Sequence, residues 1–213
     1  MGMVDVQETP IAAGSSCLVR HVRPAVSREM ARALFEQRRR IPFRRFIERL
    51  AFRRADSAGP APKWPLHIEQ VWLPHYLVDF DVREGGSSGR VVAFVESRSG
   101  AFSILNSEDG ILEGPIDGDR LPCGMTSEQA IETARRSLAV SSLRQRGRRG
   151  RLAVENVRGS TLVYHPYWVC HYERRPGHLD FIAFDAASGE RVRAKLKTAL
   201  LDAFVAAHAR QEG

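Results

Sequence analysis

The stretch VYHPYWVCHY (Val163–Tyr172) decides the fold, because a matching stretch, VWLPHYLVDF (Val71–Phe80), occurs about ninety residues earlier in the chain. Each stretch holds a proline close to aromatic residues, Pro166 in the later one and Pro74 in the earlier one. Apolar and polar residues alternate along both stretches, which is typical of β-strands. The sequence therefore predicts that one structural unit occurs twice.

Each stretch leads into a turn and then into a second apolar strand. This strand is VVAFV (Val91–Val95) in the first copy and FIAF (Phe181–Phe184) in the second. Both copies end in an acid-x-x-Ser-Gly sequence, ESRSG from Glu96 and DAASG from Asp185. The acid can accept hydrogen bonds from turn amides while the glycine adopts a positive φ, so we interpret both sequences as hairpin turns with a structural role.

The alternation assigns side chains to the two faces of each strand. In the first copy the apolar face holds Tyr76, Val78, Phe80 and Val82. The opposite face, which we interpret as a polar outer surface, holds His75, Leu77, Asp79 and Asp81. In the second copy the apolar face holds Trp168, Cys170 and Tyr172. We therefore expect Cys170 to lie in the core.

Five aromatic residues surround the two prolines: Trp72, Tyr76, Tyr164, Tyr167 and Trp168. Because aromatic side chains bury large apolar areas, we expect them to build the cores and to pack the two halves together. The alternative is that they line a groove between the halves, where a peptide would bind as an added edge strand.

Helix signals precede both strand pairs. TSEQ (Thr126–Gln129) is a capping box, and it is followed at helical spacing by Ala130, Ile131, Ala134 and Leu138. Upstream, Ser27 is positioned to cap a helix that should end before Pro42. A short helix then carries Phe43, Phe46, Ile47 and Leu50 on one face, and residues 57–65 form a loop. A last helix over Ala194–Ala209 has one apolar side made of Leu196, Leu200, Ala203, Phe204 and Ala207.

These patterns predict an α+β fold of two tandem helix-plus-antiparallel-sheet repeats, related by a pseudo-twofold axis and followed by a C-terminal amphipathic helix. The predicted divisions are an N-terminal segment (1–24), a first α+β repeat with a helical insert (25–105), an acidic Gly/Pro linker (106–124), a second α+β repeat (125–193) and the C-terminal helix (194–213).

Residues 125–193 resemble a PepSY domain. The resemblance rests on the TSEQAI start, on the central strand flanked by aromatic residues, and on the FDAASGERV ending, whose turn at Asp185–Glu190 matches the family's Asp-Ala-x-Thr/Ser-Gly-x pattern. It implies a small helix-on-sheet, cystatin-like fold, with residues from about 25 to 104 as a diverged second copy. It also implies an inhibitory or regulatory role, often toward exported peptidases, and it transfers no catalytic residue.

Positive charge is concentrated in two segments of the chain, whose formal net charge is +7. Residues 20–54 hold twelve Arg against three Glu, and residues 135–158 hold eight Arg against Glu155 alone. Such clusters can attract nucleic acid, an anionic membrane or an acidic protein, or can simply form a solvated surface. As candidates for binding a polyanion or a partner we select Arg38, Arg39, Arg40, Arg44, Arg45, Arg146, Arg148, Arg149 and Arg151.

Composition limits the class of protein. Hydrophobic residues make up 43% of the 213 residues and charged residues 27%, which is typical of globular proteins. The start of the sequence lacks the basic and apolar regions of an export signal, and no apolar run is long enough to span a membrane. We therefore expect a cytoplasmic protein. Cys17, Cys123 and Cys170 lie far apart and form no C-x-x-C pair, which argues against a disulfide framework or a zinc ribbon.

No residue is assigned to catalysis, to a cofactor or to a metal. His165 and His171 lie about 20 Å apart on an extended strand, too far for one ion. Asp79 and Asp81 share a face at about 7 Å, a spacing compatible with paired carboxylate chemistry. The spacing of Gly110, Gly114 and Gly118 fits no phosphate-binding loop.

Three functions remain open at this point. The first is a non-enzymatic binding or regulatory module that holds a protein or peptide partner through the groove between the repeats, the Arg-rich surface or the C-terminal helix, with homo-oligomers formed through that helix. The second is a nucleic-acid-associated protein that uses the Arg-rich segments 38–45 and 144–151. The third is an enzyme that uses Asp79, Asp81 or Cys170.

Overall fold

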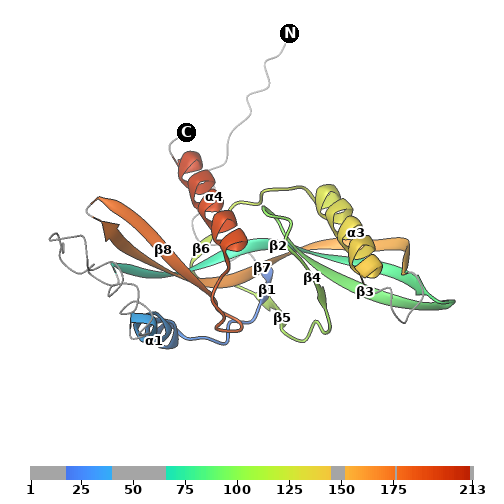
Figure 1. The fold of residues 1–213 in the computed structure, drawn as a ribbon, viewed down its shortest axis with the longest axis horizontal. Helices are drawn as coiled ribbons and strands as arrows, with labels where there is room; N and C mark the ends of the chain where they lie inside the picture. The colour runs from blue at the N-terminus through green and yellow to red at the C-terminus, as the bar shows by residue number, and fades with distance from the viewer. Residues whose placement is uncertain (1–17, 40–65, 145–151, 176, 212–213) are drawn as a thin grey trace, which may run out of the picture.

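The computed structural model describes residues 18–39, 66–144, 152–175 and 177–211 (Figure 1). In chain order its elements are β1 (Val19–Val22), α1 (Arg28–Arg39), β2 (His67–Glu84), β3 (Ser87–Glu96), β4 (Phe102–Leu105), β5 (Ile111–Gly114), β6 (Asp119–Arg120), α3 (Ser127–Arg144), β7 (Ala153–Arg175), β8 (His178–Asp185) and α4 (Ala194–Gln211). The predicted α+β class is confirmed.

The described strands form one mixed sheet in the order β4-β3-β2-β7-β1-β5, with β6 beside β2 and β8 beside β7. Its centre is the long antiparallel pair of β2 and β7, in which Leu73 lies opposite His165 and Pro74 lies opposite Tyr164. The hairpin β2–β3 occupies one end of the sheet and the hairpin β7–β8 the other (Figure 1). The short strands β1 and β6 run parallel to β7 and β2 near the centre.

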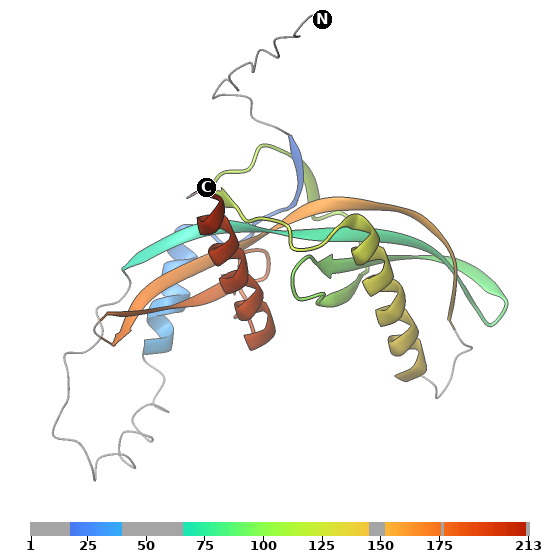
Figure 2. The same ribbon diagram turned by 90° about the horizontal axis from the view of Figure 1, so that it is seen from above.

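The hairpin β7–β8 is covered on both faces. Trp168 and Cys170 pack against α1, whereas Tyr167 and Val169 pack against α4. Because neighbouring residues of a strand point to opposite faces, α1 and α4 lie on opposite sides of this hairpin, as Figure 1 shows. Both helices lie at the same end of the sheet, and α3 lies at the other end (Figure 2).

The helices are exchanged between the two halves of the sequence. Helix α1 precedes β2 in the chain, yet Val26, Ala31 and Phe35 bury their side chains against the hairpin β7–β8. Helix α3 precedes β7, yet Ala130, Ala134 and Leu138 bury theirs against the hairpin β2–β3. The order of helix and strand pair agrees with the sequence analysis, but α1 packs on the hairpin β7–β8. Helix α3 packs on the hairpin β2–β3 together with Val154 and Val157 at the start of β7.

A short connection explains this exchange for α3. Strand β6 pairs with β2 at Val71 and Trp72, and Leu121 donates its backbone N–H to the Trp72 carbonyl at 2.9 Å. Only a few residues separate Leu121 from the start of α3 at Ser127. The chain is therefore held beside β2, and α3 is in reach of the hairpin β2–β3 rather than the hairpin that follows it in sequence.

We predict that Tyr76→Phe loosens the helix of the opposite half. The Tyr76 hydroxyl donates a hydrogen bond to the Met125 carbonyl at 3.1 Å, just before α3. Loss of this bond should cost about 1 kcal/mol. Amide hydrogen exchange should become faster in the first turn of α3 while α1 is unchanged. The control is Tyr172→Phe, which removes a hydroxyl bonded to Asp180 instead; equal effects of both variants on α3 would contradict the prediction.

The predicted helix caps are confirmed. Thr126 donates its backbone N–H to Gln129 Oε1 at 2.9 Å, and Gln129 donates its own N–H to Thr126 Oγ1 at 3.4 Å, which is the reciprocal pair of a capping box. Ser27 Oγ accepts the Met30 N–H at 3.2 Å and so caps α1. The apolar side predicted for the last helix is also confirmed, because all five of its residues pack in the core beneath α4.

The two predicted turns are confirmed as well. Glu96 accepts the backbone N–H groups of Arg98 and Ser99, and Asp185 accepts those of Ala187 and Ser188. The glycines that close the turns have positive φ, 62° at Gly100 and 76° at Gly189. The carboxylates and glycines therefore have the structural role expected of them.

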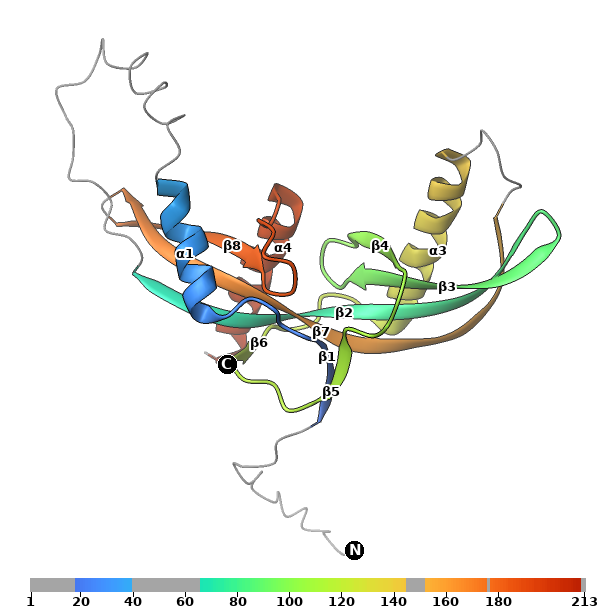
Figure 3. The ribbon, with the colours of Figure 1, turned by 90° about the horizontal axis from the view of Figure 1, so that it is seen from below.

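Residues 106–124, treated above as a linker, contribute to the sheet. They contain β5, which pairs with β1, and β6, which pairs with β2. Because β4 and β5 lie at opposite edges of the sheet, the chain between them crosses its face (Figure 3). The short helix expected near residues 43–50 and the loop at 57–65 lie outside the described residues.

Within the described ranges, no helix combines the length and the apolar character required to span a membrane.

Candidate functional site

Four rings meet at the centre of the β2–β7 pair, and we call them the central ring cluster: His75, Phe94, His165 and Tyr167. The His75 ring stacks on Phe94 with the centroids 4.4 Å apart, and its centroid lies 5.3 Å from that of His165. Tyr167 lies 4.9 Å from His165. The cluster draws residues from β2, β3 and β7, so it forms where the two hairpins meet.

An acid from the turn after β8 completes one side of the cluster. His165 Nε2 lies 3.0 Å from Asp185 Oδ1. Burial raises the pKa of Asp185, but the contact with His165, its charge and the turn amides outweigh this, so that the pKa of Asp185 falls below its ordinary value. Asp185 is therefore held as the carboxylate.

Burial keeps the two other polar rings, those of His75 and Tyr167, in their neutral forms. His75 is 4% exposed, and its Nδ1 donates to the Leu73 carbonyl at 3.0 Å. Burial and the neighbouring His165 lower the pKa of His75 to about 3, because no water solvates a charge there. Burial, together with the charges of Asp185 and Glu96, raises the pKa of Tyr167 well above its ordinary value. Both rings are neutral at pH 7.

Glu96 is the second acid beside the cluster. It is buried and lies opposite His75 in the β2–β3 register. Its two carboxylate oxygens accept the backbone N–H groups of Arg98 and Ser99 at 2.7 and 2.5 Å. Two histidines of the cluster thus lie beside two acids, and both acids already accept hydrogen bonds from turn amides.

Among the residues that the structure describes, no group of three or more His, Cys, Asp or Glu side chains is arranged to hold a metal ion. His165 Nδ1 is buried and has no hydrogen-bond partner there.

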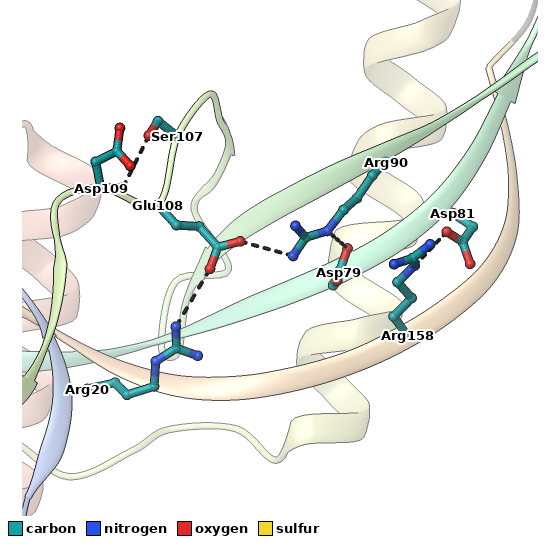
Figure 4. Close-up of polar contacts among 8 residues, drawn as sticks. All are labelled: Arg20, Asp79, Asp81, Arg90, Ser107, Glu108, Asp109 and Arg158. Carbon is teal, nitrogen blue, oxygen red and sulfur yellow. Dashed lines mark hydrogen bonds and ion pairs between the residues drawn. The ribbon is translucent and has the colours of Figure 1, made fainter.

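Asp79 belongs to a network of charges away from the cluster, and Asp81 forms an ion pair of its own (Figure 4). Asp79 pairs with Arg90 at 2.8 Å, and Asp81 pairs with Arg158 at 2.7 Å. Arg90 also reaches Glu108 at 3.0 Å, on the chain that crosses the sheet, and Glu108 lies 3.6 Å from Arg20 of β1. Each carboxylate of the predicted pair thus has its own guanidinium. The network connects β1, β2, β3 and the crossing chain.

Arg158 has a particular place in the β2–β7 pair. Asp79 lies opposite Gly159 and Phe80 lies opposite Val157, so Arg158 is the extra residue of a β-bulge. The charge of Arg158 is neutralised by Asp81.

Cys170 lies in the core, as predicted. Its side chain is fully buried against α1, and burial raises the pKa of its thiol to about 11. A thiol with such a pKa is a poor nucleophile at pH 7. His171 contacts Glu69 at 2.6 Å while His165 contacts Asp185, so these two histidines have different partners.

The Arg-rich candidates fall mostly outside the described residues. Arg38 and Arg39 are the last two residues of α1, and nothing describes their side chains. The others lie outside the described ranges: Arg40, Arg44, Arg45, Arg146, Arg148, Arg149 and Arg151. Binding of a polyanion through them stays a prediction.

The aromatic residues around the prolines are mainly core residues. Trp72, Tyr167 and Trp168 are buried, and Tyr76 and Tyr164 are half-buried. Pro74 and Pro166 are fully buried too. The strands β2 and β7 pair directly at the place where the groove between the halves was expected. Binding of a peptide there stays a prediction.

The central ring cluster was not predicted from the sequence. The prediction that His75 and Leu77 lie on a polar outer surface was wrong, because both are buried. The assignment holds for Asp79 and Asp81 further along the same face. One signal was available: His75 and His165 both lie beside the prolines of the matching stretches, and Asp185 opens the turn that follows the second stretch.

Comparison of the chain with protein-family models, with curated proteins and with solved structures gave no match.

Proposed function

We propose that the protein is a non-enzymatic binding or regulatory module, built from two copies of one PepSY-like unit, that holds a protein or peptide partner. The observation that carries this proposal is that the contacts between helix, strand and turn occur in matching pairs. In such a protein the acids and the thiol stabilise the fold, and the outer surfaces of the helices and strands are available to bind a partner.

The matching contacts involve corresponding residues of the two stretches. Trp168 Nε1 donates to the Val26 carbonyl before α1, as the Tyr76 hydroxyl donates to the Met125 carbonyl before α3. The carbonyls of Pro74 and Pro166 accept N–H groups from Ser97 and Ala186, the second residue of each turn. The parallel pairing of His21 with Tyr164 corresponds to that of Arg120 with Trp72. These pairs support a pseudo-twofold axis near Leu73 and His165.

The side chains with the strongest chemical potential have structural partners. Asp79 and Asp81 are paired with arginines, and Cys170 is enclosed in the core. Glu96 and Asp185 hold turns together. This use of acids and thiol supports a binding role over a catalytic one.

The surface best suited to a partner lies on α4. The backbones of β2 and β7 pair directly where the halves meet, so we place the partner site on the outer surface. Leu201 and Val205 lie one turn apart on α4 and are 51% and 63% exposed. Arg193, Lys195 and Arg210 are exposed toward the two ends of α4, and Asp202 is exposed next to Leu201. The chemistry that fits is a segment with apolar residues and flanking acids.

A double substitution tests this surface. Leu201→Asp with Val205→Asp should reduce recovery of the cross-linked partner from the native host at least tenfold, because exposed apolar anchors and the charge balance are both lost. The control is Val140→Asp with Leu143→Asp on α3, two residues that are also exposed. We expect this control to retain the partner.

Other outcomes would replace the proposal. Equal recovery by both double variants would remove α4 as the site. Self-association of the purified chain that depends on Leu201 and Val205 would identify the partner as a second copy. Co-purifying nucleic acid, released steeply by salt, would favour the Arg-rich segments instead.

A further inference from the structure

We propose that the central ring cluster is an acid-sensitive switch, in which protonation of His75 loosens the junction between the two halves of the chain. The inference goes beyond the proposed binding role, because it concerns how the scaffold responds to its surroundings. It rests on where His75 lies and on which groups face it.

Four titratable groups face His75 from the elements packed around it. His165 and Tyr167 come from β7, Glu96 from β3 and Asp185 from the turn after β8. Glu96 accepts two turn amides, and Asp185 contacts His165 and two further amides. A proton on His75 would therefore meet a second histidine at close range and acids whose oxygens already accept other hydrogen bonds.

The stacking leaves the His75 ring little room to reach water. Phe94 covers one face at 4.4 Å and nearly parallel, and the Tyr167 centroid lies 6.5 Å away. Charging His75 therefore requires the rings to separate. These rings belong to β2, β3 and β7. Their separation therefore weakens the packing between the two halves of the chain, and not the packing within one hairpin.

The direction of the pH effect follows from the two states of His75. Its pKa is about 3 in the folded chain and 6.5 in the unfolded chain. Between these values the unfolded chain binds a proton that the folded chain does not, so stability falls as the pH drops below 6.5. At pH 5 the unfolding equilibrium constant should rise about 30-fold through His75 alone, which equals about 2 kcal/mol. Asp185, whose folded pKa is below its ordinary 3.8, adds a loss at still lower pH.

The test compares denaturant unfolding at pH 7.5 and pH 5. From pH 7.5 to pH 5 the folding equilibrium constant of the wild type should fall about 30-fold through His75. The His75→Phe variant should lack this fall, because phenylalanine keeps the stacked ring and takes up no proton. His178→Gln is the matched control, since it removes an exposed histidine and should respond to pH as wild type does. If His75→Phe and wild type lose stability equally, the switch is excluded.

Hydrogen exchange of the wild-type protein gives a second readout that needs no variant. After correction for the intrinsic effect of pH, the amides of β2 and β7 around Leu73 and His165 should exchange faster at pH 5 than at pH 7.5. The outer parts of both hairpins should change less. If the amides around Leu73 and His165 exchange no faster at pH 5 than at pH 7.5 after this correction, the proposal is overturned.

Discussion

Division of the chain between Ile116 and Asp117 is expected to give two fragments that do not fold alone but fold when they are mixed. Residues 1–116 keep the hairpin β2–β3 and lose α3, whose Ala130, Ala134 and Leu138 cover Phe80. Residues 117–213 keep the hairpin β7–β8 and lose α1, whose Phe35 packs edge-on against Phe184. Each fragment also loses its partner in the central β2–β7 pair.

The expected loss exceeds what either fragment can tolerate. Burial of one large apolar side chain stabilises a fold by about 1.5–3 kcal/mol, and a whole domain is stable by only about 5–15 kcal/mol. Removal of α3 uncovers several residues that are fully buried, among them Val78, Phe80 and Val95. We therefore expect each isolated fragment to lack a cooperative unfolding transition.

Circular dichroism and size-exclusion chromatography of the separate and mixed fragments measure this result. The control is a full-length chain with a protease site inserted at the same position and cleaved after folding, which should remain one particle. A cooperative transition in either isolated fragment would mean that residues 25–105 or 125–193 fold as independent domains, and the packing of exchanged helices would then be dispensable.

Gly118→Ala should destabilise the protein by about 3 kcal/mol. Gly118 has φ +95°, which side chains rarely adopt, and a Cβ there would lie 2.5 Å from the Gln70 carbonyl oxygen. Left-handed strain costs about 1–2 kcal/mol, and the contact with backbone forces β6 away from β2. The neighbouring Asp117 carbonyl accepts the Trp72 Nε1–H, so this hydrogen bond is weakened as well.

Denaturant midpoints of wild type and variant measure this loss. Gly110→Ala is the matched control, because a Cβ at Gly110 meets nothing within 4 Å. We expect the control to change the free energy of unfolding by less than about 0.5 kcal/mol. If the two alanine variants are equally stable, the close approach of Gly118 to β2 does not contribute to the fold.

The features that the sequence predicted correctly depend on residues close together in the chain. The capping box at Thr126, the carboxylate turns at Glu96 and Asp185 and the apolar side of α4 each need only a few consecutive residues. The core position of Cys170 follows from alternation along one strand. The residues of such a segment by themselves determine its local hydrogen bonds and its apolar periodicity.

The features that the sequence missed depend on which distant segment lies next to a given face. His75 and Asp79 share one face of β2, yet His75 is enclosed by rings from β3 and β7, while Asp79 reaches solvent and pairs with Arg90. Alternation gives both residues the same face and cannot say what covers it. The strands β1, β5 and β6 are short and carry too little pattern to be recognised.

The sequence alone determined the elements, their caps and turns and the class of the fold, because hydrogen bonds and side-chain periodicity within a segment select helix, strand or turn. The tertiary structure decided that α1 and α3 pack on the hairpins of opposite halves, and that His75, His165 and Asp185 meet. These contacts join residues up to about 150 positions apart, as Phe35 and Phe184 show. They follow from strand pairing and short connections, which fix the segments that each apolar face can reach.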